Sequence, residues 1–449
     1  MALEINKEFI QNLEQLIQSN NDDALLKQLE EEHPADIAEI IDILNLSNAT
    51  YLFKLLDSER TSEALMEIDD DDREKILKNL SAEEIADEID EMDTDDAADI
   101  ISELPHERIT QVISEIEDDD HAKHIVDLLR YKEGTAGSLM AKELVKAKEN
   151  WTIPICVTEM RNQAKEVTRV HSIYVVDKND GLIGRLSLKD LLVASDKSKV
   201  SDVYIPKVDS VNVNDNVEDV ARIMQKYDLE AIPVVNDENH LEGRITIDDI
   251  VDLIKEEAEK DYQMAAGITE DVEDDDNIFE KTKARLPWLI LGLFGGLAAA
   301  SIMGGFEDAL LIYPELFYFT PLIAAMAGNV GVQSSAIIVQ GLANDNIRGS
   351  MFNRMIKEIG LSLVNGIILA GLIFLFGIFL NYNINISITI AISLIIVIII
   401  ASLIGTFVPL ILDKKGIDPA VATGPFITTS NDIFGIFIFF YIAKIILGF

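Results

Sequence analysis

The chain is poor in cysteine and in positive charge. Its 449 residues include one cysteine, Cys156, so no disulfide can form within the chain, and this composition suits a reducing cytoplasm. The first 20 residues are polar and amphipathic, which is not the pattern of a secretory signal. The 37 Lys and Arg are outnumbered by 79 Asp and Glu. Such a polyanion is expected to bind multivalent cations, and it argues against nucleic acid as a partner.

The acidic excess lies in one part of the chain. Residues 1–280 carry 71 acidic and 28 basic side chains, whereas residues 281–449 carry 8 and 9. One interpretation is an acidic surface that only keeps the protein soluble. The other is a surface that binds counterions as part of its function. The length allows several domains.

The hydrophobic third of the chain predicts five spans of a lipid bilayer. A span needs about 20 mostly apolar residues, and candidates lie at 287–306, 318–342, 359–381, 385–412 and 421–447. Loops that contain Lys or Arg, such as Lys281, Arg348 and Lys414, alternate with loops that contain none. The positive-inside rule therefore places the N-terminus in the cytoplasm and the C-terminus outside.

Asp432 is the leading functional candidate. It lies in an otherwise uncharged run from Pro425 to Gly435. A carboxylate at mid-membrane depth costs roughly 2.5 to 3.5 kcal/mol, so it rarely occurs there without water or a cation beside it. Mg²⁺ gives up its water reluctantly, so carboxylates and neutral oxygens around a hydrated ion would suit it. Such neutral pore-lining groups are predicted at Gly328, Asn329, Gln333, Thr428, Thr429 and Asn431.

Two further observations limit this site. The predicted spans contain no His or Cys, which disfavours a site tuned for zinc or copper. Asp418, followed by Pro419, is either the N-cap of span five or an acid at the mouth of the pore.

A repeat of 12 residues organises the N-terminal part. An apolar residue followed by a polar one recurs at Leu56-Asp57, Ile68-Asp69, Leu80-Ser81 and Met92-Asp93. Asp57, Asp69, Ser81 and Asp93 are good N-caps. The segments between them fit only short helices, which must stack on their neighbours to bury a face. The sequence thus predicts an all-α superhelix over residues 1–130. Caps explain many of its acids, but not their density between residues 83 and 99.

A longer repeat, with an offset of 59 residues, covers residues 137–252. Ser172-Ile-Tyr-Val-Val-Asp177 matches Ala231-Ile-Pro-Val-Val-Asn236, and Gly184 to Asp190 matches Gly243 to Asp249. This pattern resembles a tandem pair of cystathionine-β-synthase (CBS) domains, an α/β module that often binds adenosine nucleotides. The resemblance implies ribose contacts, for ATP or another adenine nucleotide, at Ser187, Asp190, Thr246 and Asp249. Ser187 and Thr246 could equally be plain helix N-caps.

A charged helix and an acidic linker connect this pair to the first span. The predicted domains are therefore residues 1–130, 131–247, 248–285 and 286–449: superhelix, CBS pair, connecting helix with linker, and five-helix transmembrane domain. The connecting helix with its linker, residues 248–285, has two interpretations: a solvated connector or a gate. We expect multivalent cations to bridge acids of the first three segments, namely Glu88, Glu91, Asp95, Asp249, Asp252, Glu256 and Glu259.

The whole order of segments resembles the MgtE family of bacterial magnesium channels. The matching motifs are His33-Pro-Ala-Asp36, Met92 to Asp99, Thr135 to Met140, Gly328-Asn-Val-Gly-Val-Gln333, Asp418-Pro-Ala, and Gly424 to Thr429 followed by Asp432 and Gly435. The resemblance implies a homodimer in the bacterial cell membrane, with its pore between spans two and five, Asp432 on the axis, and closure by cytosolic Mg²⁺. Val332 stands where the family can carry a second Asn, so the polar lining there is thinner.

Other functions are weighed against this one. A regulated channel for Co²⁺ or Ca²⁺ fits every residue above and differs only in the ion. A membrane-anchored CBS signalling protein leaves Asp432 unexplained. An enzyme is disfavoured because no nucleophile, base or metal-ligand set converges at one membrane face, and a chloride channel because a lone Asp repels anions.

Overall fold

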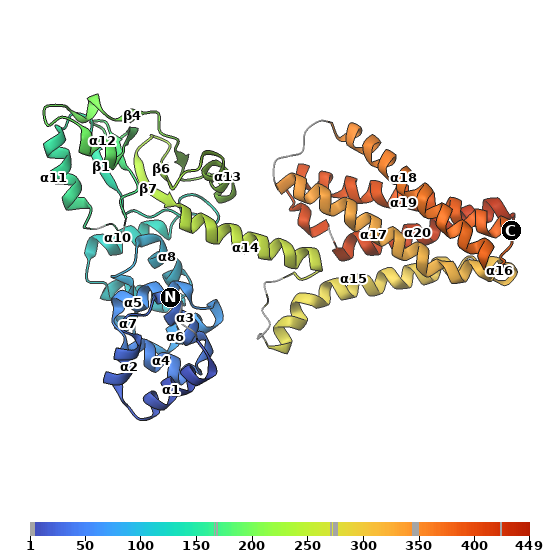
Figure 1. The fold of residues 1–449 in the computed structure, drawn as a ribbon, viewed down its shortest axis with the longest axis horizontal. Coiled ribbons are helices and arrows are strands. Elements are labelled where there is room, and N and C mark those ends of the chain that lie inside the picture. Colours follow the sequence, from blue (N-terminus) through green and yellow to red (C-terminus); the bar gives the residue numbers. More distant parts are fainter. Residues whose placement is uncertain are drawn as a thin grey trace. The chain divides into compact units, whose positions relative to one another are not determined.

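The computed structural model describes residues 5–165, 167, 169–269, 272, 277–343, 350–422 and 424–449. These form two compact units, Met1–Ile254 and Lys255–Phe449. The first unit holds short helices followed by two small sheets, and the second holds five long helices (Figure 1).

The 12-residue repeat forms the predicted short helices. Those from α3 to α9 begin at positions spaced 12 residues apart, and alternate helices pack together: α3 with α5, α5 with α7, α7 with α9, α4 with α6. Their apolar sides share one core, which includes Ile37, Leu65 and Ile85. The helices are α1 Lys7–Gln18, α2 Asp22–Leu29, α3 Pro34–Ile43, α4 Leu46–Leu55, α5 Ser58–Glu67, α6 Asp70–Asn79, α7 Ala82–Ile89, α8 Thr94–Ser102, α9 His106–Glu115 and α10 Asp119–Leu128.

The four predicted caps all stand at N-cap positions, but they do different things. Ser81 forms a full capping box with Glu84, and Asp69 accepts a hydrogen bond from the Asp71 backbone N–H. The expectation that Asp57 and Asp93 cap through their side chains is wrong. Their carboxylates bind Arg60 and Arg244 instead, because a guanidinium is a stronger partner than a backbone N–H.

The 59-residue repeat forms two related sheets. One has the strand order β1-β2-β3-β4 and the other β5-β6-β7; the first two strands of each are parallel, and the rest pair antiparallel. The strands are β1 Val145–Lys148, β2 Ile173–Val176, β3 Leu182–Leu186, β4 Ile205–Pro206, β5 Val211–Asn212, β6 Ala231–Val235 and β7 Leu241–Thr246. The remaining helices of this region are α11 Ile153–Gln163, α12 Leu188–Val193, η1 Val200–Asp202, α13 Val217–Tyr227 and α14 Ile247–Ala266.

Equivalent turns make the two halves of this repeat face each other. The Asp177 carboxylate accepts hydrogen bonds from two backbone N–H groups of its turn, and Asn236 does the same in the other copy. The turns then pair, since the Leu182 N–H donates to the Asn239 carbonyl. The result is the tandem α/β pair that the repeat predicts.

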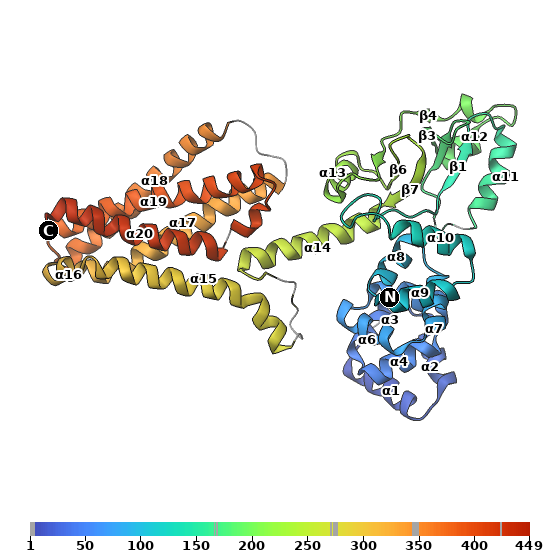
Figure 2. The same cartoon turned by 180° about the vertical axis from the view of Figure 1, so that it is seen from behind.

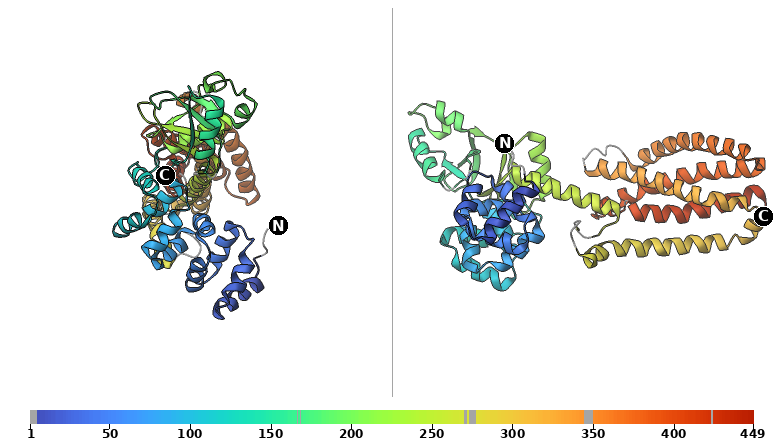
Figure 3. Two further views of the ribbon diagram at one scale, coloured as in Figure 1. Left: turned by 90° about the vertical axis from the view of Figure 1, so that its left-hand side faces the viewer. Right: turned by 60° about the horizontal axis from the view of Figure 1, so that its bottom comes forward.

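Five of the described helices are long and apolar enough to cross a membrane. They run side by side, with α19 packed against α17, α18 and α20, and α15 against α20 (Figures 2 and 3). They are α15 Ile278–Gly304, α17 Glu315–Ala343, α18 Met351–Phe379, α19 Ile384–Lys414 and α20 Gly424–Leu447, with the short helices α16 Glu307–Ile312 and η2 Pro419–Ala422 between them. The chain is thus a multidomain, mainly helical membrane protein.

Candidate ion pathway and acidic cluster

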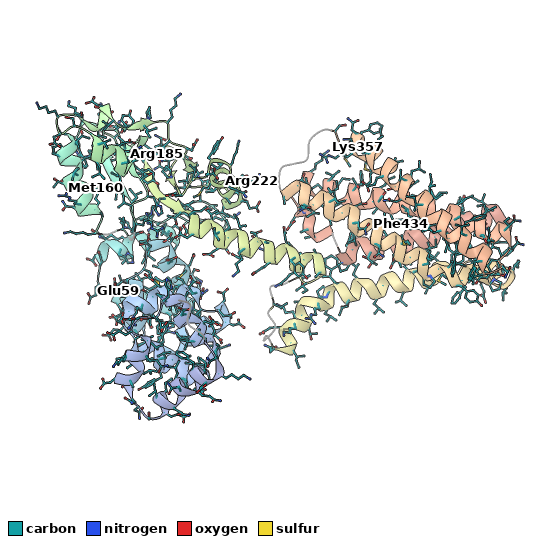
Figure 4. All side chains as sticks on the ribbon, in the orientation of Figure 1. Glu59, Met160, Arg185, Arg222, Lys357 and Phe434 are labelled. Atoms are coloured by element: carbon teal, nitrogen blue, oxygen red, sulfur yellow. The ribbon has the colours of Figure 1, made fainter. Side chains whose placement is uncertain are left out.

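Asp432 lies where α20 crosses α17. The crossing is close because α17 has a glycine there: a methyl group at Gly328 would lie 3.5 Å from Asp432 Oδ1 and 3.1 Å from Thr428 Cγ2. Thr428 and Asp432 are one helical turn apart, so both side chains rest on the same glycine. Asp432 is only half buried, and Phe434, labelled in Figure 4, is half exposed on the same helix.

The other predicted pore-lining residues divide into three groups. Asn329 and Gln333, one turn apart on α17, are exposed on the surface of the chain. The Thr429 side chain points toward α15, and its methyl group lies against Gly295. Asn431 is buried inside the helix bundle. Exposed amides at membrane depth need water or another polar surface beside them, which is compatible with the predicted pore-lining role of Asn329 and Gln333.

The structure places an acid inside a membrane helix where the predicted spans had none. Glu358 lies within α18, and its Oε1 accepts a 2.7 Å hydrogen bond from the Ser334 hydroxyl of α17. The predicted third span began at residue 359, whereas α18 already begins at Met351. Glu358 therefore links two membrane helices.

Asp418 caps a helical turn. Its Oδ1 accepts a 2.8 Å hydrogen bond from the Ala420 N–H at the start of η2, and its side chain is exposed. This contact supports the N-cap interpretation over a place in the ion path.

In the first unit, acids gather between the helical repeat and the CBS pair. A cavity of about 300 Å³ is lined by residues of α5, the loop between α7 and α8, α8, the segment before β2, β7 and α14. We call five of its lining side chains the acidic cluster: Asp93, Asp95, Asp96, Asp248 and Asp249. Arg244 brings a cation to this cluster, with Nη2 3.3 Å from Asp93 Oδ2, and Arg169 lines the same cavity. In the described part of the chain, no three His, Cys, Asp or Glu side chains are placed to hold one metal ion together.

Burial and mutual repulsion disfavour ionisation of this cluster. Burial, with repulsion from Asp249, raises the pKa of Asp95 and raises that of Asp96 to about 7. The pKa of Asp249 is also raised by burial, although Thr246 hydrogen bonds oppose the shift. Asp95 is 8% exposed and Arg244 is 5% exposed, so water screens these charges poorly. A divalent cation would relieve the repulsion.

The cluster overlaps the predicted cation-bridging set in part. Of that set, Asp95, Asp249 and Glu91 line the cavity. Glu88 is 6% exposed and faces α5, where the Thr61 hydroxyl donates to it at 2.7 Å. Asp252, Glu256 and Glu259 are exposed along one face of α14. Asp93 and Asp96 belong to the dense acidic stretch between residues 83 and 99, but only the structure brings Asp248 and Arg244 to them, through contacts about 150 residues apart.

Further contacts fix the helical repeat to the CBS pair. Glu143 accepts hydrogen bonds from the backbone and the hydroxyl of Thr94 at 3.2 and 2.8 Å. Lys142 Nζ lies 2.8 Å from Asp127 Oδ2. Thr94 begins α8 next to Asp95, so these contacts hold the acids of α8 close to those of α14.

The four predicted nucleotide contacts form local hydrogen bonds within each copy. The Ser187 hydroxyl donates to Asp190 Oδ2 at 2.7 Å and accepts from the Asp190 N–H, so Ser187 is an N-cap, as one alternative from the sequence allowed. In the second copy the Thr246 hydroxyl and backbone N–H both donate to Asp249 Oδ2, at 2.7 and 2.9 Å.

The acidic cluster predicts an unusual dependence of stability on pH. Burial raises the pKa of Asp96 to about 7 and that of Asp99, one turn further along α8, to about 6, from an ordinary value of 3.8, so between pH 3.8 and 7 the folded chain holds more protons than the unfolded chain. The contribution of these two groups to the free energy of unfolding is therefore fully present below about pH 4 and is lost as the pH rises toward 7. We expect the melting temperature of the full-length chain in EDTA to fall over this range, and to fall less in Asp96→Asn. Wild type and variant with parallel pH profiles would contradict this.

Comparison with known proteins shows the family. The MgtE "divalent cation transporter" model matches residues 320–442, the MgtE intracellular N domain matches 32–134, and CBS domains match 136–197 and 200–256. The magnesium transporter MgtE of Enterococcus faecalis is 37% identical over 322 residues, 71% of each chain. Those of Bacillus subtilis and Thermus thermophilus are 35% and 31% identical over at least 70% of each chain. The chain belongs to the MgtE family.

Solved structures agree with the membership of this family. The soluble part of a magnesium transporter aligns with a TM-score of 0.51 and 29% identity, over 56% of this chain and 99% of that one. The cytosolic domain of the Mg²⁺ channel MgtE in complex with ATP aligns with a TM-score of 0.51 and 31% identity, over 54% and 99%. The predicted family and fold class are thus confirmed, and the MgtE family is one of transporters rather than enzymes.

Proposed function

We propose that the chain forms a Mg²⁺ channel that closes when cytosolic Mg²⁺ rises. Its parts are those expected from the sequence: a helical domain over 1–130, a CBS pair over 131–247, a connecting segment over 248–285 and a membrane domain over 286–449. The observation that supports this most is Asp432 on a glycine-lined helix crossing, next to the exposed amides of α17. A carboxylate with neutral oxygens around it suits a hydrated dication.

Ion flux into liposomes tests this function. Purified chain in liposomes, with Mg²⁺ on one side, should admit Mg²⁺ faster than empty liposomes do. Parallel runs with Co²⁺ and Ca²⁺ decide ion identity, because a channel for another divalent ion shares every feature described above. No flux of any of the three ions would favour the remaining alternative, a membrane-anchored signalling protein.

The basic residues support a cytosolic N-terminus. Lys281, Lys283 and Arg285 begin α15, Arg354 and Lys357 lie near the start of α18, and Lys414 and Lys415 end α19 (Lys357 is labelled in Figure 4). Arg348, also predicted to lie on this side, falls outside the described residues. Lys444, in the last turn of α20, is the one described exception in a span. Most of the basic residues of the membrane unit thus lie at the start of α15, the start of α18 and the end of α19, and the positive-inside rule assigns these helix ends to the cytoplasm.

The acidic cluster is the part of the chain that we assign to sensing. Without cations its carboxylates repel one another across the boundary between the helical domain and the CBS pair, as their raised pKa values indicate. Mg²⁺ bound there would favour the compact arrangement. Since a ligand shifts an equilibrium only by its differential affinity, several weak sites acting together are needed for a sharp response. The exposed Asp252, Glu256 and Glu259 extend this surface along α14.

A homodimer is supported by apolar side chains that the CBS pair exposes at repeated positions. Leu192 on α12 is 81% exposed, and its equivalent 59 residues later, Val251 on α14, is 55% exposed. Leu188 and Ile247 are exposed equivalents in the same way. Lone exposed apolar residues are ordinary, but an apolar strip duplicated in both copies fits a symmetric interface.

We expect Leu192→Glu combined with Val251→Glu to raise the dimer dissociation constant about tenfold or more, because each buried aliphatic side chain contributes about 1.5 to 3 kcal/mol. Mass photometry of the detergent-solubilised chain against dilution measures this. Ile155→Glu is the matched control: Ile155 is exposed and apolar, but its repeat equivalent is Asn214. If the wild-type protein has the mass of a single chain and still conducts Mg²⁺ in liposomes, the proposed dimer is wrong.

An adenine nucleotide is also proposed as a ligand of the CBS pair. The solved relative in complex with ATP supports this, and Ser187 with Asp190 holds the matching motif. Titration of the full-length chain with ATP would decide it.

A further inference from the structure

Asn431 is buried in the membrane unit without a hydrogen bond. Its side chain is 1% exposed, and neither Oδ1 nor Nδ2 has a partner among the described residues. A carboxamide offers two donors and an acceptor oxygen. Leaving these unpaired in an apolar interior is strongly unfavourable, so an unsatisfied group of this kind needs a physical explanation.

The packing around Asn431 is unusually close. A methyl group at Gly331 of α17 would overlap the Asn431 amide and contact Ile427, one turn earlier on α20. A methyl group at Gly405 of α19 would overlap the Gly331 carbonyl. Three helices therefore meet at this point, with the amide held against glycine backbone. An aliphatic side chain of similar size would fill the same space without losing hydrogen bonds, so packing alone does not explain an amide here.

The neighbouring residues connect this point to the ion path. Asp432 and Thr428 rest on Gly328, one turn along α17 from Gly331. Successive residues of a helix are rotated by about 100° about its axis. A rotation of the whole of α20 about its axis therefore moves Asn431 and Asp432 by the same angle. The start of α20 is in contact with the end of α14 and the residue after it: methyl groups at Gly424 and Gly267 would overlap the Ala265 carbonyl and the Pro425 ring. Both contacts lie within the second unit.

We propose that this arrangement is the non-conducting one, and that release of the Ala265–Gly267 segment lets α20 rotate by part of the ~100° between neighbouring residues, so that the Asn431 amide reaches the water of the ion path while Asp432 stays beside it. The proposal rests on the proposed Mg²⁺ channel and its closure by cytosolic Mg²⁺. Water would then satisfy the amide, so Asn431 favours the conducting state. Bound cations at the acidic cluster act against this bias, and the channel has two discrete states because glycine-packed crossings do not deform gradually.

The first test replaces the amide by an apolar group of similar size. Asn431→Leu should change the equilibrium between the two states about tenfold toward closure, which corresponds to about 1.4 kcal/mol. If two or three ions act together, the Mg²⁺ concentration for half-closure falls about two- to threefold. Thr320→Val is the control, because the buried Thr320 hydroxyl already donates to the Leu316 carbonyl. This substitution should leave the Mg²⁺ concentration for half-closure unchanged. Half-closure of Asn431→Leu equal to or above that of wild type would overturn the proposal.

The second test measures access of water and does not depend on the folding of the leucine variant. In a Cys156→Ser background, Asn431→Cys should react with a charged methanethiosulfonate reagent at low Mg²⁺ and be protected at high Mg²⁺. Phe439→Cys, buried two turns along the same helix, should stay protected in both. Equal reactivity of position 431 at both Mg²⁺ concentrations would overturn the proposal. Wild-type flux is measured in the same liposomes: absence of flux, or flux without closure, rejects the proposed function rather than this inference.

Discussion

Asp432→Asn is expected to remove selective Mg²⁺ flux while leaving the protein folded. The change keeps the size of the side chain and its fit on Gly328, but it removes the charge that attracts a hydrated dication. Because a hydrated Mg²⁺ keeps most of its water, a neutral amide can offer hydrogen bonds but little electrostatic attraction. We expect Mg²⁺ uptake into liposomes to fall to near the background of empty liposomes. Fluorescent size-exclusion chromatography would show that the variant is inserted and intact.

Glu358→Gln provides the matched control for this loss. It neutralises another acid within a membrane helix, but a Gln side chain can still accept the Ser334 hydrogen bond. We expect its flux to resemble that of wild type. If properly inserted Asp432→Asn conducts like wild type, Asp432 is not the ion-binding group. If both variants lose flux, any charge change within the spans disrupts the channel, and the assignment of Asp432 fails as well.

Deleting residues 1–130 is expected to leave a conducting channel that no longer closes over the millimolar range of cytosolic Mg²⁺. The deletion removes Asp93, Asp95 and Asp96, and so leaves only Asp248 and Asp249 of the acidic cluster. Weak carboxylate sites respond in the millimolar range, and their joint action is lost when one side of the interface is absent. Flux into liposomes with Mg²⁺ varied on the cytosolic side measures this.

Point variants make the same test without removing a domain. Asp95→Asn with Asp96→Asn should weaken the Mg²⁺ response several-fold. Asp219→Asn, at an exposed position on α13 that pairs with Arg222, should not. Protection of the 267–276 linker from protease should rise with Mg²⁺ in wild type and not in the truncated chain. A truncated channel that closes at the wild-type concentration would show that sensing lies elsewhere.

The sequence by itself determined most of the architecture, because repeats and hydrophobic runs are properties of the local chain. The 12-residue period predicted the starts of α5 to α8, since each short helix must present an apolar side to its neighbours. The 59-residue offset gave two equivalent sheets, and long apolar runs gave the five membrane helices. Asp432 stood out for the same reason, because a charge in the middle of an apolar run is visible in the sequence and is unfavourable at membrane depth without water or a cation beside it.

Only the tertiary structure decided which side chains meet. Asp93 and Arg244 are 151 residues apart, and no local pattern predicts their contact. Asn431 and Asp432 are adjacent in sequence, yet Asp432 rests on Gly328 and Asn431 is enclosed at Gly331, because a helix turns about 100° per residue and glycines on the facing helix set which side packs closely. Glu358 became a link between helices once Ser334 lay opposite it. Periodicity specifies which faces are buried, whereas the pairing of faces depends on how the helices pack against each other.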